Sequence, residues 1–157
     1  MPLSLITVGK IAKPFAEAAR EYEKRLSRYD KVDVIELSDE KEPAHLSPAA
    51  IAQVMDKEGR NILGRVRRED AVVALCIEGQ AQTSEQLADT VSRLRMDGRR
   101  IVFIIGGSLG LSQEVVARAD IRLSLSSMTM PHQLARVVLL EQIYRAFKII
   151  SGERYHK

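Results

Sequence analysis

Short apolar segments alternate with helical patterns along the whole 157-residue sequence. Continuously apolar segments, such as residues 71–77 and Ile101–Ile105, are typical of strands that helices cover on both faces. Five such strand-and-helix units predict an α/β fold, with a mainly parallel sheet and helices on both sides. The expected strands are Leu3–Val8, Val32–Leu37, 71–77, Ile101–Ile105 and 121–125.

Capping signals predict where several helices begin. Ser47 followed by Pro48 indicates a helix start, because a serine oxygen caps the first turn and proline suits the first helical position. Thr83 with Gln86 has the spacing of a capping box, and Ser112 is expected to cap a short helix.

The size and composition of the chain limit its class. We expect one domain, 1–157, large enough to bury a core without a disulfide or a metal. The lone cysteine, Cys76, favours a reducing, cytoplasmic compartment. The start resembles no signal peptide, and no apolar run reaches the roughly 18 residues of a membrane span. His45, His132 and His156 are scattered, so no metal site is expected.

Basic residues cluster although the net charge is only +3. Arginines gather within residues 60–68 and again within residues 93–100. Such clusters either meet the phosphates of a nucleic acid or face solvent on a helix, and the sequence leaves both open. The chain has no tryptophan, so an aromatic platform for stacked bases is not visible.

The last predicted helix, from His132 to about Ile150, is apolar around most of its circumference. A helix of this kind must bury more than one face. A second copy of the chain is the natural cover, so we expect a homodimer. The alternative is a helix packed centrally within its own chain.

Two flexible loops are expected to follow the fourth and fifth strands. The first loop contains Gly106, Gly107 and Gly110, and glycine lets a backbone approach a ligand closely. A loop rich in serine, threonine and methionine follows, ending at Pro131. Open α/β sheets bind ligands at such carboxyl ends, although a tight connection without a ligand fits the glycines too. The sequence GGSLG matches neither common nucleotide-phosphate pattern, nor a serine-nucleophile elbow.

Three segments closely resemble one known family: IGGSLGLS at 105–112, LSLSSMTMPHQLARVVLLEQIYRA at 123–146 and ERYHK at 153–157. This is the ribosomal RNA large-subunit methyltransferase H family, of the SPOUT or α/β-knot class, and the resemblance covers essentially the whole chain. Its members methylate N3 of a pseudouridine in large-subunit (23S) ribosomal RNA. The resemblance therefore implies S-adenosylmethionine as cofactor, ribosomal RNA or the ribosome as partner, an obligate homodimer and a C-terminal trefoil knot.

The resemblance also implies which residues hold the cofactor. In this class the cofactor lies, bent, among the loops that follow the third, fourth and fifth strands. The positions implied here are Leu75, Gly106, Leu125, Ser126, Ser127, Met128, Thr129 and Met130.

The C-terminal tail is the candidate for catalysis. Arg154, Tyr155 and His156 place a guanidinium, a phenol and an imidazole within three positions. Arginine suits a phosphate or a delocalised anion, tyrosine can stack or hydrogen-bond, and histidine can relay a proton. In a dimer this tail would reach the partner's cofactor. The alternative is a frayed terminus.

The leading hypothesis is thus an S-adenosylmethionine-dependent RNA methyltransferase. Two rivals belong to other classes. One is a non-catalytic RNA- or ribosome-binding dimer, and the other is a small flavodoxin-like domain that binds a nucleotide phosphate at the glycine loop.

Overall fold

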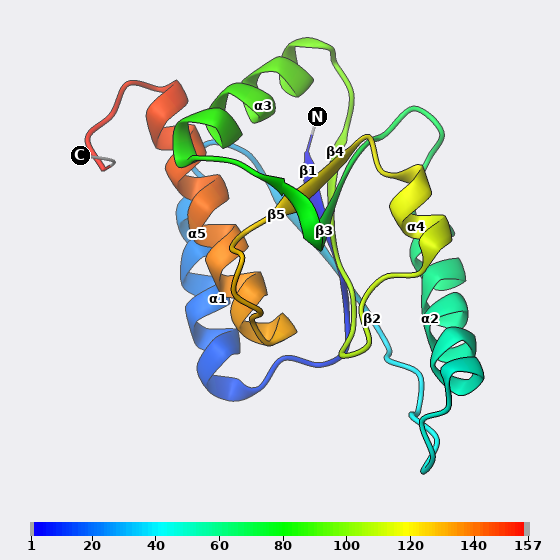
Figure 1. The fold of residues 1–157 in the computed structure, drawn as a ribbon. Helices are drawn as coiled ribbons and strands as arrows, with labels where there is room; N and C mark the ends of the chain where they lie inside the picture. The colour runs from blue at the N-terminus through cyan, green and yellow to red at the C-terminus, as the bar shows by residue number, and fades with distance from the viewer. Residues whose placement is uncertain (1, 156–157) are drawn as a thin grey trace.

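The computed structural model describes residues 2–155, which form a five-stranded sheet between two layers of helices (Figure 1). The strand order is β2-β1-β4-β3-β5, and every neighbouring pair is parallel. The predicted α/β class is therefore confirmed. The strands are β1 (Leu3–Val8), β2 (Val32–Leu37), β3 (Ala71–Ala81), β4 (Ile101–Ile105) and β5 (Ile121–Ser124).

The helices divide between the two faces of the sheet (Figure 1). One face packs against three helices, α1 (Lys13–Leu26), α3 (Ser84–Met96) and α5 (His132–Ile150). The other face packs against α2 (Pro48–Leu63) and the short α4 (Gln113–Arg118). Both faces of the central strands are thus shielded from water, which explains their continuous apolar sequences.

The central strands β1 and β4 are buried along their whole length. Alternate side chains of a strand point to opposite faces, so each strand supplies two cores. Leu5 and Phe103 belong to the core beneath α1, α3 and α5, whereas Ile6 and Ile104 belong to the core beneath α2 and α4. Each such fully buried side chain contributes about 1.5–3 kcal/mol to folding.

All three predicted helix caps are confirmed. The Ser47 oxygen accepts a hydrogen bond from the Ala50 backbone nitrogen at 3.1 Å, and Thr83 forms both halves of the capping box with Gln86. The Ser112 oxygen accepts from the Val115 nitrogen at 3.4 Å.

The third strand is longer than its apolar run predicts. Beyond Leu75 its pairing with β5 shifts, and Gln80 lies opposite the same Leu123 that Leu75 faces. A Cβ on Gly79 would lie 2.8 Å from the Leu123 carbonyl carbon, so only glycine allows this close passage of the two strands. The apolar pattern missed the extension because residues 77–81 are mostly exposed.

The last helix packs against α1 and α3 of its own chain. Ile143 and Phe147 are buried there without any second subunit. At these two positions α5 fits the alternative given above, a helix packed within its own chain. Leu134 and Ile150 are the large apolar residues that α5 leaves exposed.

Two further observations apply to residues 2–155. No helix in this range has the length and apolar character that crossing a membrane requires. No three histidine, cysteine, aspartate or glutamate side chains within it gather as a group able to hold a metal ion.

Candidate functional site

The carboxyl ends of three adjacent strands lie side by side. Because β3 pairs with both β4 and β5, the positions of Leu75, Gly106 and Leu125 all fall at this edge of the sheet. The topology thus brings together the glycine loop, the β5–α5 loop and the stretch of β3 around Leu75. Leu75 lies within β3, which continues to Ala81, and not in a loop after the strand as expected; these three segments are called the three loops below. Such an edge is where open parallel sheets bind ligands.

The loop after β4 turns back on itself at its glycines. The Gly110 nitrogen donates a hydrogen bond to the Gly107 oxygen at 3.0 Å, and Gly110 has a φ of +90°, which favours glycine. A Cβ on Gly106 would lie 2.9 Å from both the Gly110 carbonyl carbon and the Leu111 Cδ2 atom. Glycine at 106 is therefore required by the turn of the loop itself.

A buried carboxylate from α2 faces this glycine loop. Glu58 is only 4% exposed, and its Oε1 atom would lie 3.0 Å from a Cβ on Gly107. Its Oε2 atom accepts a hydrogen bond from the Glu40 nitrogen at 2.9 Å. Burial raises the pKa of Glu58, and the neighbouring carboxylates raise it further, whereas the Glu40 hydrogen bond opposes the shift. Sequence analysis missed Glu58, although it stands in the Asp56–Gly59 segment that precedes the last turn of α2.

The segment between β2 and α2 also contacts the glycine loop. The Ser108 hydroxyl donates a hydrogen bond to Glu42 Oε1 at 2.5 Å. Together with the bond from Glu40 to Glu58, this places acidic groups along one side of the loop. A cationic ligand group is favoured in such surroundings.

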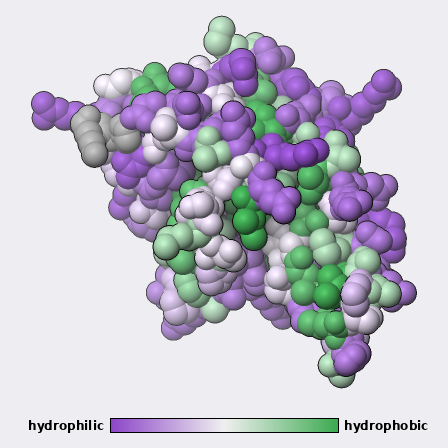
Figure 2. Space-filling view, viewed as in Figure 1, coloured by the Kyte–Doolittle hydropathy of each residue, from purple (hydrophilic) through white to green (hydrophobic). Residues whose placement is uncertain are grey.

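The loop between β5 and α5 is ordered by its serines. The Ser124 hydroxyl donates to the Ser126 carbonyl oxygen at 3.0 Å, and the Ser126 hydroxyl accepts from the Met128 nitrogen at 3.0 Å. The Met128 side chain is 78% exposed. Figure 2 shows apolar side chains interrupting the polar surface near the centre of this face, over β3 and β5.

The C-terminal tail lies elsewhere on the same chain. The Tyr155 ring packs edge-on against Tyr144, and its hydroxyl donates to Glu141 Oε1 at 3.3 Å. Figure 1 shows the red segment that follows α5 near the end of this helix opposite the β5–α5 loop. Glu141, to which the Tyr155 hydroxyl is bonded, lies roughly 13 Å along the helix axis from His132, where α5 begins. The structure therefore does not bring Arg154 or Tyr155 to the three loops, and His156 lies outside the described residues.

The arginine clusters are used partly within the protein. Arg100 donates from Nε to the buried Asp70 carboxylate at 2.9 Å, and Arg99 donates to the Asp70 carbonyl oxygen at 2.7 Å. Arg118 donates to the Arg67 carbonyl oxygen at 2.8 Å. These three guanidinium groups tie loops together at the amino ends of the strands.

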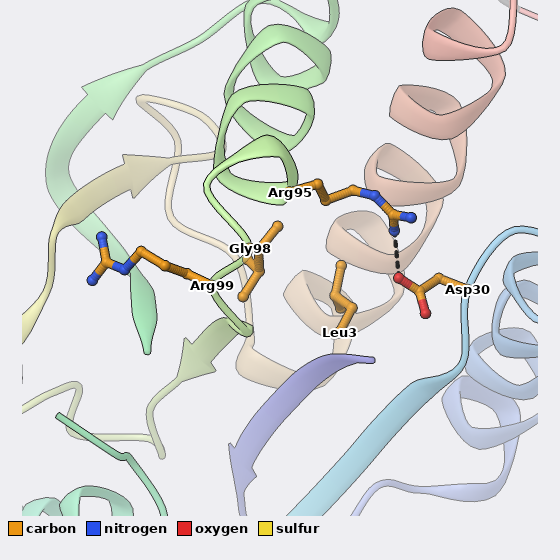
Figure 3. Close-up of a pocket in the computed structure, with 6 residues that line it drawn as sticks. Leu3, Asp30, Arg95, Gly98 and Arg99 are labelled. Carbon is orange, nitrogen blue, oxygen red and sulfur yellow. Dashed lines mark hydrogen bonds and ion pairs between the residues drawn. The ribbon is translucent and has the colours of Figure 1, made fainter. Parts of the chain in front are cut away.

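A small hollow lies at the edge of the sheet where the strands begin (Figure 3). Its volume is about 60 Å³, and the ion pair between Arg95 and Asp30 borders it. Ligand sites usually have volumes of roughly 300–1,000 Å³, so this hollow is too small to hold a cofactor. The residues that line it are Leu3, Asp30, Arg95, Gly98, Arg99 and Ile101.

The parallel sheet with helices on both faces defines an open α/β protein, and comparison with known proteins assigns its class. A family model described as "Predicted SPOUT methyltransferase" matches residues 1–156. Ribosomal RNA large subunit methyltransferase H of Bacillus pumilus (strain SAFR-032) is 52% identical over 159 residues, covering 100% of both chains. The protein of that name from Clostridioides difficile (strain 630) is 51% identical with the same coverage.

The chain therefore belongs to the ribosomal RNA large subunit methyltransferase H family of SPOUT methyltransferases. Enzymes of this class use S-adenosylmethionine as the methyl donor. Membership also implies a C-terminal trefoil knot, an exception to the rule that protein chains avoid knots.

Proposed function

We propose that this chain methylates N3 of a pseudouridine in 23S ribosomal RNA, as a homodimer in which each tail completes the partner's active site. The observation that supports the composite site is the separation of its parts. The β5–α5 loop leads into the start of α5, whereas Tyr155 is docked on the later part of that helix, beside Glu141 and Tyr144. Glu141 lies roughly 13 Å along the helix axis from His132, so Tyr155 as it is docked here does not reach the loops of its own chain.

The residues at the three loops fit S-adenosylmethionine. Leu75 and Leu125 are half-buried apolar side chains suited to the faces of an adenine ring. The backbone of Gly106 and of residues 125–130 supplies donors and acceptors to its edges. Glu42, bonded to Ser108, gives this side of the site the negative charge that a sulfonium cation favours. When bound, the cofactor supplies an electrophilic methyl group.

The chain's own residues then position the acceptor base and stabilise its charge. The N3 proton of the base must pass to solvent water, and the resulting anion spreads over the two neighbouring carbonyl oxygens until N3 takes up the methyl group. We assign Arg154 to this anion or to an RNA phosphate, because a planar guanidinium binds both well. Burial raises the pKa of Tyr155, with the Glu141 carboxylate adding to the shift. The phenol thus stays protonated at neutral pH and acts as a hydrogen-bond donor.

Apolar surface at the proposed site supports a dimer. Ile77 on β3, Met128 in the β5–α5 loop and Leu134 on α5 are exposed large apolar residues. A second subunit seated over them would also bring its tail to the three loops. We further propose that residues 1–157 act as a single catalytic domain and, given a ribosomal substrate, that the protein works in the cytoplasm.

The decisive test is transfer of a labelled methyl group. The protein is incubated with methyl-labelled S-adenosylmethionine and with whole ribosomes, free large subunits or naked 23S RNA. Nucleosides are then released and identified by mass spectrometry. We expect label in N3-methylpseudouridine. Label in a different nucleoside would overturn the proposed acceptor, and calorimetry without any binding of S-adenosylmethionine would favour the non-catalytic RNA-binding dimer.

A further inference from the structure

A small cavity of about 10 Å³ lies beneath the first turn of α5, at the carboxyl ends of β1 and β4. Strand register explains its position: Thr7 of β1 lies between Glu36 of β2 and Ile105 of β4. Arg136 of α5 reaches over this row and donates from Nη1 to Glu36 Oε2 at 2.8 Å. Thr7, Ile105 and Arg136 all line the cavity.

Two buried polar atoms beside this cavity have no hydrogen-bond partner within the chain. They are Thr7 Oγ1 and Arg136 Nε, the two such side-chain atoms found among residues 2–155. Thr7 is 4% exposed and Arg136 is 8% exposed, so bulk solvent does not serve them. Buried polar groups are almost always hydrogen-bonded, and a buried donor without an acceptor is costly even where, as in Arg136, another nitrogen of the same guanidinium is bonded. One small molecule that accepts from Nε and donates to Oγ1 would satisfy both atoms.

We infer that the cavity is the binding site of one structural water molecule. Its volume is close to the smallest that holds a water molecule, roughly 10–15 Å³. The water oxygen would accept from Arg136 Nε, and one of its hydrogens would be donated to Thr7 Oγ1. A cation is repelled by the guanidinium, and a phosphate or carboxylate is too large for a space of about 10 Å³.

This water would link strand β1 to helix α5 and so position the start of that helix. Two direct bonds act at the same junction: the one from Arg136 to Glu36, and the one from the Ala12 nitrogen to Gln133 Oε1 at 2.6 Å. Residues 125–131 end where the first turn of α5 begins, so the position of that turn fixes one end of this loop. Ile105, which lines the cavity, immediately precedes Gly106 of the glycine loop. The water thereby helps to hold two of the three loops in register, a consequence that rests on the proposed cofactor site.

A crystal structure of the full chain at high resolution tests the inference directly. We expect one ordered water within about 3.2 Å of both Thr7 Oγ1 and Arg136 Nε. An empty cavity, or any occupant other than water, would overturn the proposal. Neither result depends on methyl transfer, so failure of the proposed function and failure of the water site are distinguishable.

Two substitutions provide an independent measurement in solution. Thr7→Val keeps the shape of the side chain and removes its hydroxyl, whereas Thr7→Ser keeps the hydroxyl. We expect Thr7→Val to lower Tm by roughly 2–4 °C relative to the wild type. Thr7→Ser measures the separate cost of the lost methyl group, and a Thr7→Val variant as stable as the wild type would show that the hydroxyl binds nothing. If Thr7→Val does not fold, the wild-type crystal structure still decides the matter.

Discussion

Tyr155 lies edge-on against Tyr144, with 4.9 Å between the ring centroids, and Arg145 stands 4.7 Å from the Tyr155 ring centroid. The tail is thus docked on α5 of its own chain, away from the three loops at the carboxyl edge of the sheet. Cofactor binding and the catalytic contribution proposed for the tail should consequently be separable by mutation.

Deletion of residues 154–157 should abolish methyl transfer and leave the affinity for S-adenosylmethionine within a few-fold of wild type. A lost transition-state contact costs about 2.7–4 kcal/mol, which is a hundredfold or more in rate. Single-turnover kinetics at saturating ribosome, with Arg154→Ala and Tyr155→Phe as separate variants, measure the loss. A fully active truncated protein would show that the tail has no role in catalysis.

Mixing two inactive variants tests whether the site is shared between subunits. The tail-deleted chain retains intact loops, and a Gly106→Val chain retains an intact tail. Refolding them together should restore part of the activity, because one of the two sites in each mixed dimer is then complete. Activity that stays at zero in the mixture, with mixed dimers present, would contradict the composite site.

Gly106→Val should abolish S-adenosylmethionine binding while the sheet stays folded. A Cβ there meets the Gly110 backbone at 2.9 Å, so the loop has to open into a different turn. Isothermal calorimetry measures the affinity, and circular dichroism checks the fold. Gly64→Ala is the matched control, because its nearest contacts would be ordinary ones at 3.4 and 3.5 Å. Unchanged affinity in Gly106→Val would mean that the loop is only a connection.

Asp70→Asn should destabilise the protein by about 3–5 kcal/mol, because it leaves the Arg100 charge without its buried partner. Burial alone would raise the pKa of Asp70, but the hydrogen bonds from Arg100 and from the Arg67 nitrogen outweigh it and lower the pKa. The stabilisation is thus present above pH 3.8 and is lost as the pH falls through the lowered value.

Urea unfolding at pH 7 and at acid pH checks both parts of this prediction. Glu21→Gln is the control, since its pair with Arg25 is exposed and is expected to contribute under about 1 kcal/mol. Equal losses of unfolding free energy in the two variants would show that the buried Asp70–Arg100 pair stabilises the protein no more than the exposed Glu21–Arg25 pair does.

Glu58→Gln should stabilise the protein at pH 7 and flatten its pH dependence. In the unfolded chain Glu58 releases its proton near the ordinary pKa of 4.5. In the folded protein the pKa is raised, so Glu58 holds the proton to a higher pH. The contribution of Glu58 to the free energy of unfolding is therefore fully present below pH 4.5 and is lost as the pH rises through the raised pKa. Urea midpoints at pH 5 and pH 7 measure the change, with exposed Asp56→Asn as control. A variant less stable than wild type at pH 7 is the contrary outcome.

The wild-type protein should sediment at micromolar concentration with twice the 17.6 kDa mass of one chain. Leu134→Asp, on the exposed side of α5, should give folded monomers, whereas Met96→Asp at the end of α3 should leave the dimer intact. Phe147→Asp should unfold the chain, because Phe147 is 4% exposed within a single subunit. A monomeric wild type would refute the dimer.

The sequence by itself determined the local structure and the family. Strand and helix patterns depend on side-chain periodicity, and caps such as Thr83 with Gln86 depend on neighbours within one turn, so both are predictable without tertiary contacts. The glycine and Ser-Thr-Met loops were identified for the same reason. The IGGSLGLS, 123–146 and ERYHK segments were specific enough to indicate the methyltransferase family.

Only the tertiary structure decided which distant residues meet. The Gly79 passage along β5, the Glu58 carboxylate against Gly107 and the cavity between Thr7 and Arg136 all join elements far apart in the chain. Burial of Ile143 by the chain's own helices, and the docking of Tyr155 on α5, were equally invisible in the sequence. Periodicity states that a side chain must be covered, but the packing of α1, α3 and α5 determines what covers it.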